Sequence, residues 1–299
     1  MPAPPPSTLD PAEIEKFGAL AAQWWNPDGP FGALHRLNPI RLQYIRDLFP
    51  PPPPAASRPA ILDRPKSQSD FGRGEVAKRS EREGVSPPAA SASPLSHAAR
   101  DSSPLKDGGA KSKRKPLAGV DALDLGCGGG LVSAPLARMG ARVTAIDAAE
   151  EAIGAARAYA VQAGLEIDFR CTSAEALAAT GVRYDLVTAL EIIEHVSDVG
   201  AFLNAATALL KPGGLLVLST INRTAKARAF AIVGAERILK WAPEGAHDYD
   251  KLVTPEEIRA GAPEIAWQAP MGISYQPLGR GWTLSHDLSI NYLMAGRRR

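Results

Sequence analysis

Hydrophobic and polar positions alternate along residues 119–299 in a pattern that predicts an α/β fold. Apolar runs of strand length occupy 120–125, 142–146, 166–171, 184–190 and 215–220, and apolar residues at helical spacing lie between them. Strands that alternate with helices through short loops form a parallel sheet with right-handed crossovers. The last segment, 265–296, alternates like a pair of antiparallel edge strands. We therefore expect a mostly parallel, doubly wound sheet of seven strands with an antiparallel C-terminal edge.

Residues 1–49 predict a helical segment outside this sheet pattern. Helical spacing begins just after Asp10, which can cap a helix that starts with proline, and Trp24-Trp25 interrupts it. A second helix is expected over about 39–49. The adjacent tryptophans could be packing side chains or a roof over a ligand site. Arg41, on the second helix, could donate to a carboxylate through two nitrogens, and the alternative for it is a solvated charge.

Residues 50–118 form an insert of different composition. They contain 12 of the 27 prolines, and 13 Lys and Arg residues against 7 Asp and Glu residues. Such a stretch cannot bury enough apolar surface to offset the entropy of ordering, so we expect disorder. The basic cluster 111–115 could touch anionic lipid or nucleic acid, but a solvated charge run is the preferred interpretation.

Composition narrows the class of protein only modestly. The chain has 299 residues and a net charge of +2, which gives no reason to expect a nucleic-acid partner. Its two cysteines, Cys127 and Cys171, form neither a disulfide framework nor a zinc site and suit a reducing cytosol. The N-terminus lacks the features of a secretory or transit peptide, and no run of 18 apolar residues could span a bilayer. We expect a cytoplasmic enzyme.

A glycine loop follows the first strand and carries the clearest chemical signal. Asp124 is followed by Gly126, Gly128 and Gly130, and Asp147 ends the second strand about 20 residues later. Glycines let the backbone approach a ligand, and the second acid is placed to face a ribose. A carboxylate two residues before the loop would repel a pyrophosphate but suits a sulfonium. The pattern therefore indicates S-adenosylmethionine as the cofactor.

Two further stretches extend the predicted ligand site at the carboxyl ends of the strands. Glu175 opens a helix after the third strand, where it and the backbone could meet an adenine edge. Glu191, Glu194 and His195 follow the fourth strand directly. On a helical turn the two carboxylates would share a face, so with the imidazole they could bind a divalent ion such as Mg²⁺. Alternatively His195 alone is a general base that removes a phenolic proton, or merely a capping or packing residue.

A basic and apolar segment, Asn222–Trp241, follows the fifth strand. It carries five Lys and Arg residues against one acid, together with aromatic and aliphatic bulk. One hypothesis is contact with an anionic membrane surface, and the other is a cap helix over the active site. The two are compatible. His247-Asp248 is a polar pair that could enter the site, and 222–253 as a whole forms the expected cap.

Several stretches together resemble the ubiquinone-biosynthesis O-methyltransferases, which are Rossmann-like class I methyltransferases. The resemblance covers 11–49 and 119–296, and the paired tryptophans with His-Arg-Leu-Asn-Pro-Ile-Arg are its most specific part. The other matching stretches are the glycine loop, Glu191–His195, Lys211–Gly214, Thr220–Arg223, Val233–Glu236, Gly245–Asp248 and Asp287–Tyr292.

The resemblance implies methylation of catechol hydroxyls on polyprenyl catechols and demethylubiquinol. It also implies that Arg41, Gly126, Asp147 and Leu190 contact adenosylmethionine, that Glu191, Glu194 and His195 hold a divalent metal, and that Asn222–Trp241 contacts a membrane. Other ubiquinone-synthesis proteins are conceivable partners, and the inner face of the bacterial plasma membrane is a conceivable location.

Two features depart from the family pattern. The insert 50–118 separates Arg41 from the strand that usually follows its helix almost directly, and Leu190 replaces what is commonly a methionine. Two alternatives stay open at this stage: methylation of a soluble small phenol, and a cofactor-binding protein without chemistry.

Overall fold

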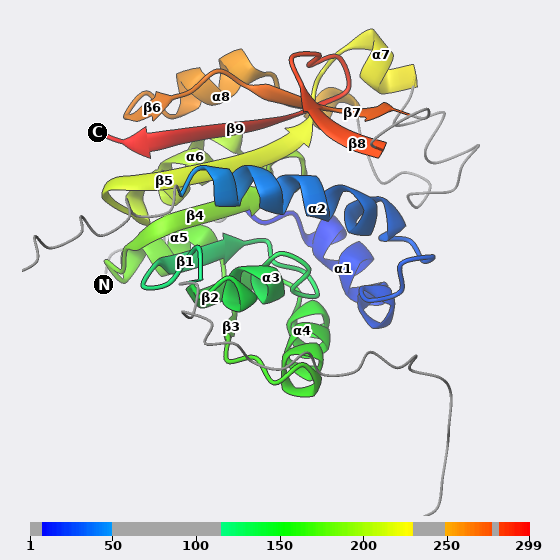
Figure 1. Ribbon diagram of the computed structural model, residues 1–299, viewed down its shortest axis with the longest axis vertical. Coiled ribbons are helices and arrows are strands. Elements are labelled where there is room, and N and C mark those ends of the chain that lie inside the picture. Colours follow the sequence, from blue (N-terminus) through cyan, green and yellow to red (C-terminus); the bar gives the residue numbers. More distant parts are fainter. Residues whose placement is uncertain (1–7, 50–114, 230–248, 277–280) are drawn as a thin grey trace, which may run out of the picture. The chain divides into compact units, whose positions relative to one another are not determined.

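One mixed sheet organises the computed structural model, which describes residues 8–49, 115–229, 249–276 and 281–299 (Figure 1). Five parallel strands come first: β1 (Asp121–Leu125), β2 (Arg142–Asp147), β3 (Asp168–Cys171), β4 (Tyr184–Leu190) and β5 (Leu210–Ile221). Four antiparallel strands follow: β6 (Ile265–Trp267), β7 (Met271–Gln276), β8 (Gly281–Ser285) and β9 (Asn291–Arg298). Their order is β3-β2-β1-β4-β5-β9-β7-β8, and β6 pairs with β9. The predicted fold class is confirmed, although the sheet formed by the described residues has nine strands instead of the expected seven.

Helices cover both faces of this sheet and create two cores (Figure 1). On one face lie α2 (Gly32–Asp47), α3 (Ser133–Arg138) and α4 (Glu150–Gln162). On the other lie α5 (Ala174–Ala179), α6 (Val199–Ala208) and α8 (Pro255–Gly261). The remaining helices are α1 (Pro11–Ala19) and the short α7 (Ala225–Ala227), and single 3₁₀ turns occupy Ala21–Gln23, Ile193–His195 and Tyr249–Lys251. None of the helices within the described ranges is long and apolar enough to cross a bilayer.

The N-terminal helices differ from the predicted ones at their ends. Asp10 caps α1 as expected, because its side chain accepts from the Ala12 N–H. The second helix begins at Gly32, seven residues before the predicted start, and contains Pro39 in its interior. A proline inside a helix removes one backbone hydrogen bond and crowds the carbonyl four residues earlier, a cost that packing can offset. The buried Ile40 and Ile45 supply that packing against the sheet.

The predicted insert lies mostly outside the described residues, which resume at 115. Its predicted C-terminal boundary at 118 is a few residues too late. Leu117 is fully buried, and its N–H donates to the Met139 carbonyl at 2.9 Å. The globular part therefore begins before residue 118, because Leu117 already belongs to the apolar core between the sheet and α2, α3 and α4.

Candidate active site

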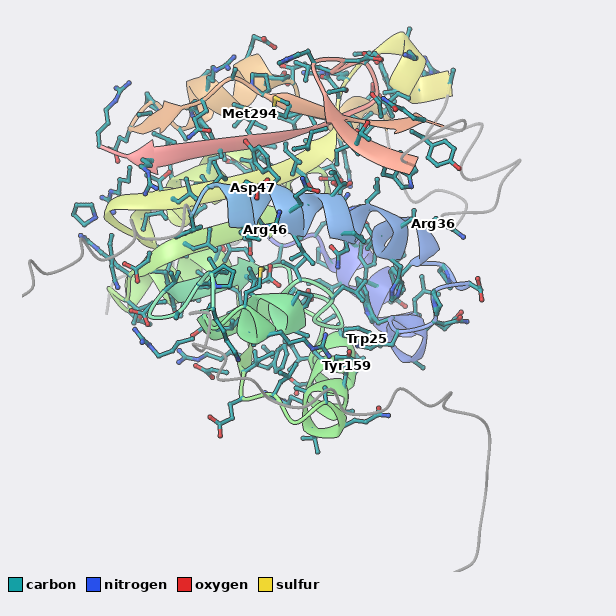
Figure 2. The ribbon with its side chains drawn as sticks, in the orientation of Figure 1. Trp25, Arg36, Arg46, Asp47, Tyr159 and Met294 are labelled. Carbon is teal, nitrogen blue, oxygen red and sulfur yellow. The ribbon has the colours of Figure 1, made fainter. Side chains whose placement is uncertain are left out.

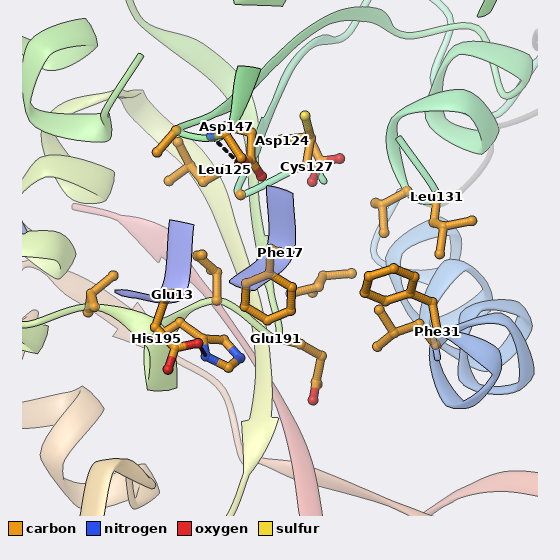
Figure 3. A pocket seen from close by; sticks show the side chains of 18 of the residues that line it. Glu13, Phe17, Phe31, Asp124, Leu125, Cys127, Leu131, Asp147, Glu191 and His195 are labelled. Atoms are coloured by element: carbon orange, nitrogen blue, oxygen red, sulfur yellow. Dashed lines mark hydrogen bonds and ion pairs between the residues drawn. The ribbon is translucent and has the colours of Figure 1, made fainter. Parts of the chain in front are cut away.

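A cavity lies at the carboxyl ends of β1, β2 and β4, where open α/β sheets bind their ligands (Figure 3). Most of its lining comes from the N-terminal segment 8–41, the glycine loop, the end of β2, the turn before α5 and the turn after β4. Phe202, Ile221, Trp282, Ile290 and Asn291 complete the lining. The cavity therefore combines the predicted cofactor loop with many apolar side chains.

The glycine loop is shaped by backbone conformation and by contact with a tryptophan. Gly126 and Gly128 have φ angles of 65° and 50°, in the left-handed region that favours glycine. A Cβ atom on Gly128 would lie 2.4 Å from the ring of Trp24. Trp24 in turn stacks on Phe31 with ring centroids 3.7 Å apart. Trp24 therefore has the packing role considered for it, and it also lines the cavity.

In the described structure Trp25 packs against its neighbours and does not line the cavity. Its indole nitrogen donates to the Gly129 carbonyl at 2.9 Å, and its ring stacks on Tyr159 of α4 with centroids 3.3 Å apart (Figure 2). The N-terminal segment is thereby tied to the loop by a hydrogen bond as well as by apolar contact.

The two acids of the loop motif lie at the cavity as expected. Asp147 accepts from the Gly128 N–H at 2.8 Å and from the Ala149 N–H at 2.9 Å, so it holds the loop and the start of α4 together. Burial raises its pKa, and these N–H groups oppose the rise. Asp124 is buried and accepts from the hydroxyls of Ser133 and Thr188. Burial also raises the pKa of Asp124, to about 6.

Arg41 reaches the same cavity from α2, despite the insert that follows its helix. It is 2% exposed, and its Nη2 lies 2.8 Å from Oε1 of Glu191. Within the described residues its Nε has no hydrogen-bond partner. A buried guanidinium with an unsatisfied donor suits an anionic ligand such as a carboxylate. Leu190, at the end of β4, is buried and lines the cavity beside it.

Glu175 does not line the cavity. Its carboxylate is buried and accepts a hydrogen bond from the hydroxyl of Thr8. The cavity wall at this point is formed by Thr172, Ser173 and Ala174. The chain just before Glu175 therefore lines the cavity, whereas the Glu175 side chain anchors the N-terminal segment.

The structure does not support the predicted metal site. Within the described ranges no group of three or more His, Cys, Asp or Glu side chains is arranged to hold a metal. Glu191 has a φ of 52° and pairs with Arg41 and the Ser219 hydroxyl. Glu194 is instead buried beneath the turn, where it accepts from Thr220, and burial raises its pKa to about 7. The left-handed residue breaks the helical turn that would have placed both carboxylates on one face.

His195 lies in the cavity wall and is held by the N-terminal helix. Its Nδ1 is 3.0 Å from Oε2 of Glu13, and its ring meets the Phe17 ring edge-on at 5.0 Å (Figure 3). The bond to His195 lowers the pKa of Glu13 to about 2. Glu13, Phe17 and Trp282 were not predicted as site residues. Glu13 and Phe17 are one helical turn apart, but nothing in their local pattern distinguishes them from ordinary helix residues.

Only the start of the predicted membrane segment is described, since 230–248 lies outside the described residues, and with it His247-Asp248. Each basic residue of the described part has a local partner. Arg223 pairs with Glu257, and Lys226 lies 3.2 Å from Asp287. Arg228 lies over the Tyr249 ring at 5.1 Å.

Comparisons with known proteins show which family the chain resembles in sequence. A family model described as a methyltransferase domain matches residues 123–218. The ubiquinone biosynthesis O-methyltransferase of Brucella ovis is 38% identical over 294 residues, which cover 98% of this chain and 97% of that protein. That of Rhizobium etli is 38% identical over 296 residues, with the same coverage. The magnesium protoporphyrin IX methyltransferase of Synechocystis, solved with bound adenosylmethionine, gives a TM-score of 0.43 at 20% identity over 61% of this chain and 72% of that one.

The fold, the glycine loop and its two acids define a methyltransferase that depends on S-adenosylmethionine. The side chains fit that cofactor, because an unsatisfied buried guanidinium and an acid at the end of β2 face the same cavity. The near full-length relatives specify the kind of methyltransferase. The chain belongs to the ubiquinone biosynthesis O-methyltransferase family.

Proposed function

We propose that this enzyme methylates a catechol hydroxyl of polyprenylated ubiquinone precursors, including demethylubiquinol. The observation that carries the proposal is the shared cavity of the glycine loop and His195. His195, which can accept a phenolic proton, thus lines the same cavity as the glycine loop. The apolar side chains Phe17, Trp282 and Ile290 line the acceptor side, which suits an aromatic ring with an isoprenoid chain.

The chain's own residues account for positioning and for the proton. When bound, adenosylmethionine supplies a methyl group activated by a sulfonium. Arg41 would hold its carboxylate, Asp147 its ribose, and residues 172–174 its adenine. The catechol oxygen would take this methyl group and leave the sulfur as a neutral thioether, and His195 would accept the phenolic proton at Nε2, since Nδ1 faces Glu13. Holding both reactants in this arrangement supplies the largest part of the rate enhancement.

The acceptor would reach the enzyme from a membrane, because polyprenyl chains partition into lipid. The composition of Asn222–Trp241 supports contact with an anionic surface. Among its described residues, Lys226 is 59% exposed on its side chain and so remains accessible from outside despite its ion pair. The enzyme would then act as a peripheral protein on the bilayer.

Methyl transfer to matched acceptors tests the proposal. The full chain is assayed with adenosylmethionine and catechols that differ only in chain length, with neutral vesicles, with anionic vesicles and without vesicles. We expect a higher kcat/KM for the long-chain catechol, and a further gain on anionic vesicles. Equal or better turnover of a soluble catechol would favour the small-phenol alternative, and equal rates on both vesicle types would contradict the membrane contact.

The charge on Asp124 should make the binding of adenosylmethionine more dependent on pH than the binding of S-adenosylhomocysteine, the product formed from it. With a pKa of about 6, Asp124 is ionised at pH 7.5 and mostly neutral at pH 5.5. We place this acid beside the sulfonium, because it lines the cavity two residues before Gly126. Adenosylmethionine affinity should therefore fall about fourfold between these pH values. S-adenosylhomocysteine lacks the positive sulfur, so its affinity should change less.

Calorimetric titration of both ligands at the two pH values measures this difference. Asp124→Asn, which keeps the size of the side chain and removes its charge, should make the two pH dependences alike. If adenosylmethionine and adenosylhomocysteine already respond equally in the unmodified enzyme, Asp124 does not face the sulfonium.

A further inference from the structure

We infer that Glu13 is a positioning residue for catalysis: it orients His195 and holds the imidazole in the tautomer that can accept the substrate proton. This inference rests on the proposed function of His195 as general base. It assigns part of the catalytic apparatus to the N-terminal helix, outside the matched methyltransferase domain of residues 123–218.

The contact between the two side chains is direct and enclosed. Oε2 of Glu13 lies 3.0 Å from Nδ1 of His195, although the residues are 182 positions apart in the chain. The His195 side chain is 10% exposed and that of Glu13 is 19% exposed. Phe17, one turn further along α1, contacts the imidazole edge-on with an interplanar angle of 84°. One face of α1 therefore determines both the position and the tilt of the imidazole.

The segment that carries Glu13 is anchored by polar contacts that do not involve His195. The Thr8 hydroxyl donates to Glu175, and the Thr8 carbonyl accepts from the Ser197 N–H at 2.9 Å. Asp10, the cap of α1, accepts from Lys251 at 2.9 Å. These anchors hold the start of α1 on the turn after β4 and on the C-terminal half of the fold. Glu13 is thus presented to His195 from a fixed support, which is what a positioning residue requires.

The chemistry of the pair determines which nitrogen reacts. An ionised carboxylate can only accept hydrogen bonds, so a contact at Nδ1 requires the hydrogen to be on Nδ1. The lone pair of the neutral imidazole then lies on Nε2, where it can take the phenolic proton. A glutamine at position 13 can instead donate its amide hydrogen to Nδ1. That contact favours the opposite tautomer, with a hydrogen on Nε2 and no site for the substrate proton.

Two glutamate-to-glutamine variants on the same helix test the inference. Glu13→Gln should lower kcat about 10- to 100-fold, part of the usual contribution of a general base, with little change in the KM for adenosylmethionine. Glu15 is exposed, so Glu15→Gln makes the same chemical change without touching the imidazole and should keep the activity of the unmodified enzyme. Equal kcat values for Glu13→Gln and Glu15→Gln would overturn the inference.

A double-mutant cycle separates positioning from a merely structural role. In a His195→Ala background, Glu13→Gln should cause no further fall in kcat, because the group it orients is gone. A fall of the same size in both backgrounds would show that Glu13 acts through the fold and would overturn the inference.

The tautomer can also be read without turnover. Nitrogen-15 spectra resolve the ring nitrogens of the five histidines, and the signal missing from His195→Ala identifies His195. When the His195 imidazole is neutral, its hydrogen should be on Nδ1. Hydrogen on Nε2 would overturn the inference even if a Glu13 variant failed to fold. Absence of methyl transfer to any catechol by the unmodified enzyme would instead contradict the proposed function and leave the spectrum to decide the tautomer.

Discussion

Replacing His195 by alanine should lower the kcat of methyl transfer by about 10²- to 10⁴-fold, the range typical for loss of a general base. The affinity for adenosylmethionine should change little, because the proposed cofactor contacts lie on the glycine loop, Arg41 and the end of β2. The phenolic oxygen is a poor nucleophile while protonated, and the described structure offers His195 at the cavity wall to take the proton. Stopped-time assays with labelled adenosylmethionine measure kcat, and calorimetry measures the cofactor affinity.

His286→Ala is the matched control for this experiment. His286 is exposed on the loop after β8 and does not line the cavity, so the variant should behave like the unmodified enzyme. Turnover by His195→Ala at the rate of His286→Ala would show that another group, or solvent, takes the proton.

Replacing Asp147 by alanine should raise the Kd for adenosylmethionine by about 100-fold, the equivalent of one to two hydrogen bonds to a charged group. Asp147 ends β2 at the cavity and accepts from the Gly128 N–H. Its loss removes the proposed acceptor for the ribose and also the hydrogen bond that holds the glycine loop. Calorimetric titration gives the Kd, and thermal melting shows whether the fold is retained.

Asp168→Ala provides the comparison for a lost aspartate. Asp168 lies at the amino end of β3, where it is exposed and pairs with Arg170. We expect a Kd within about twofold of the unmodified enzyme, as for an exposed ion pair remote from the ligand. Similar Kd values for the two aspartate variants would remove Asp147 from the cofactor site.

The strands and the glycine loop could be predicted because their determinants are local. An apolar run that ends in Asp124 and breaks into glycines specifies a strand, a turn with positive φ and a cofactor loop within a few residues. The five parallel strands accordingly occupy nearly the predicted positions, with β5 extended at its start to Leu210.

The place of Glu13 in the site could not be predicted, because its contact with His195 is made by tertiary packing. Nothing near Glu13 in the sequence indicates that it will meet a histidine 182 positions later. Packing and a place at a ligand site were both considered for Trp24, but its ring contact with Gly128 becomes evident only in the fold. The predicted metal site is not supported by the described structure for a related reason. Sequence neighbours share a face only if the backbone is helical, and the positive φ of Glu191 sends it and Glu194 to different environments.

The account's central claim is that one cavity carries a methyl group from adenosylmethionine to a catechol oxygen of a polyprenylated ring. Its most direct test incubates the purified full chain with demethylubiquinol and adenosylmethionine whose methyl group carries carbon-13, and then identifies the product by mass and NMR. The account predicts one labelled methyl group per ring, attached to oxygen at the free catechol position. Label on a ring carbon, or label only on a soluble phenol offered beside demethylubiquinol, would contradict it.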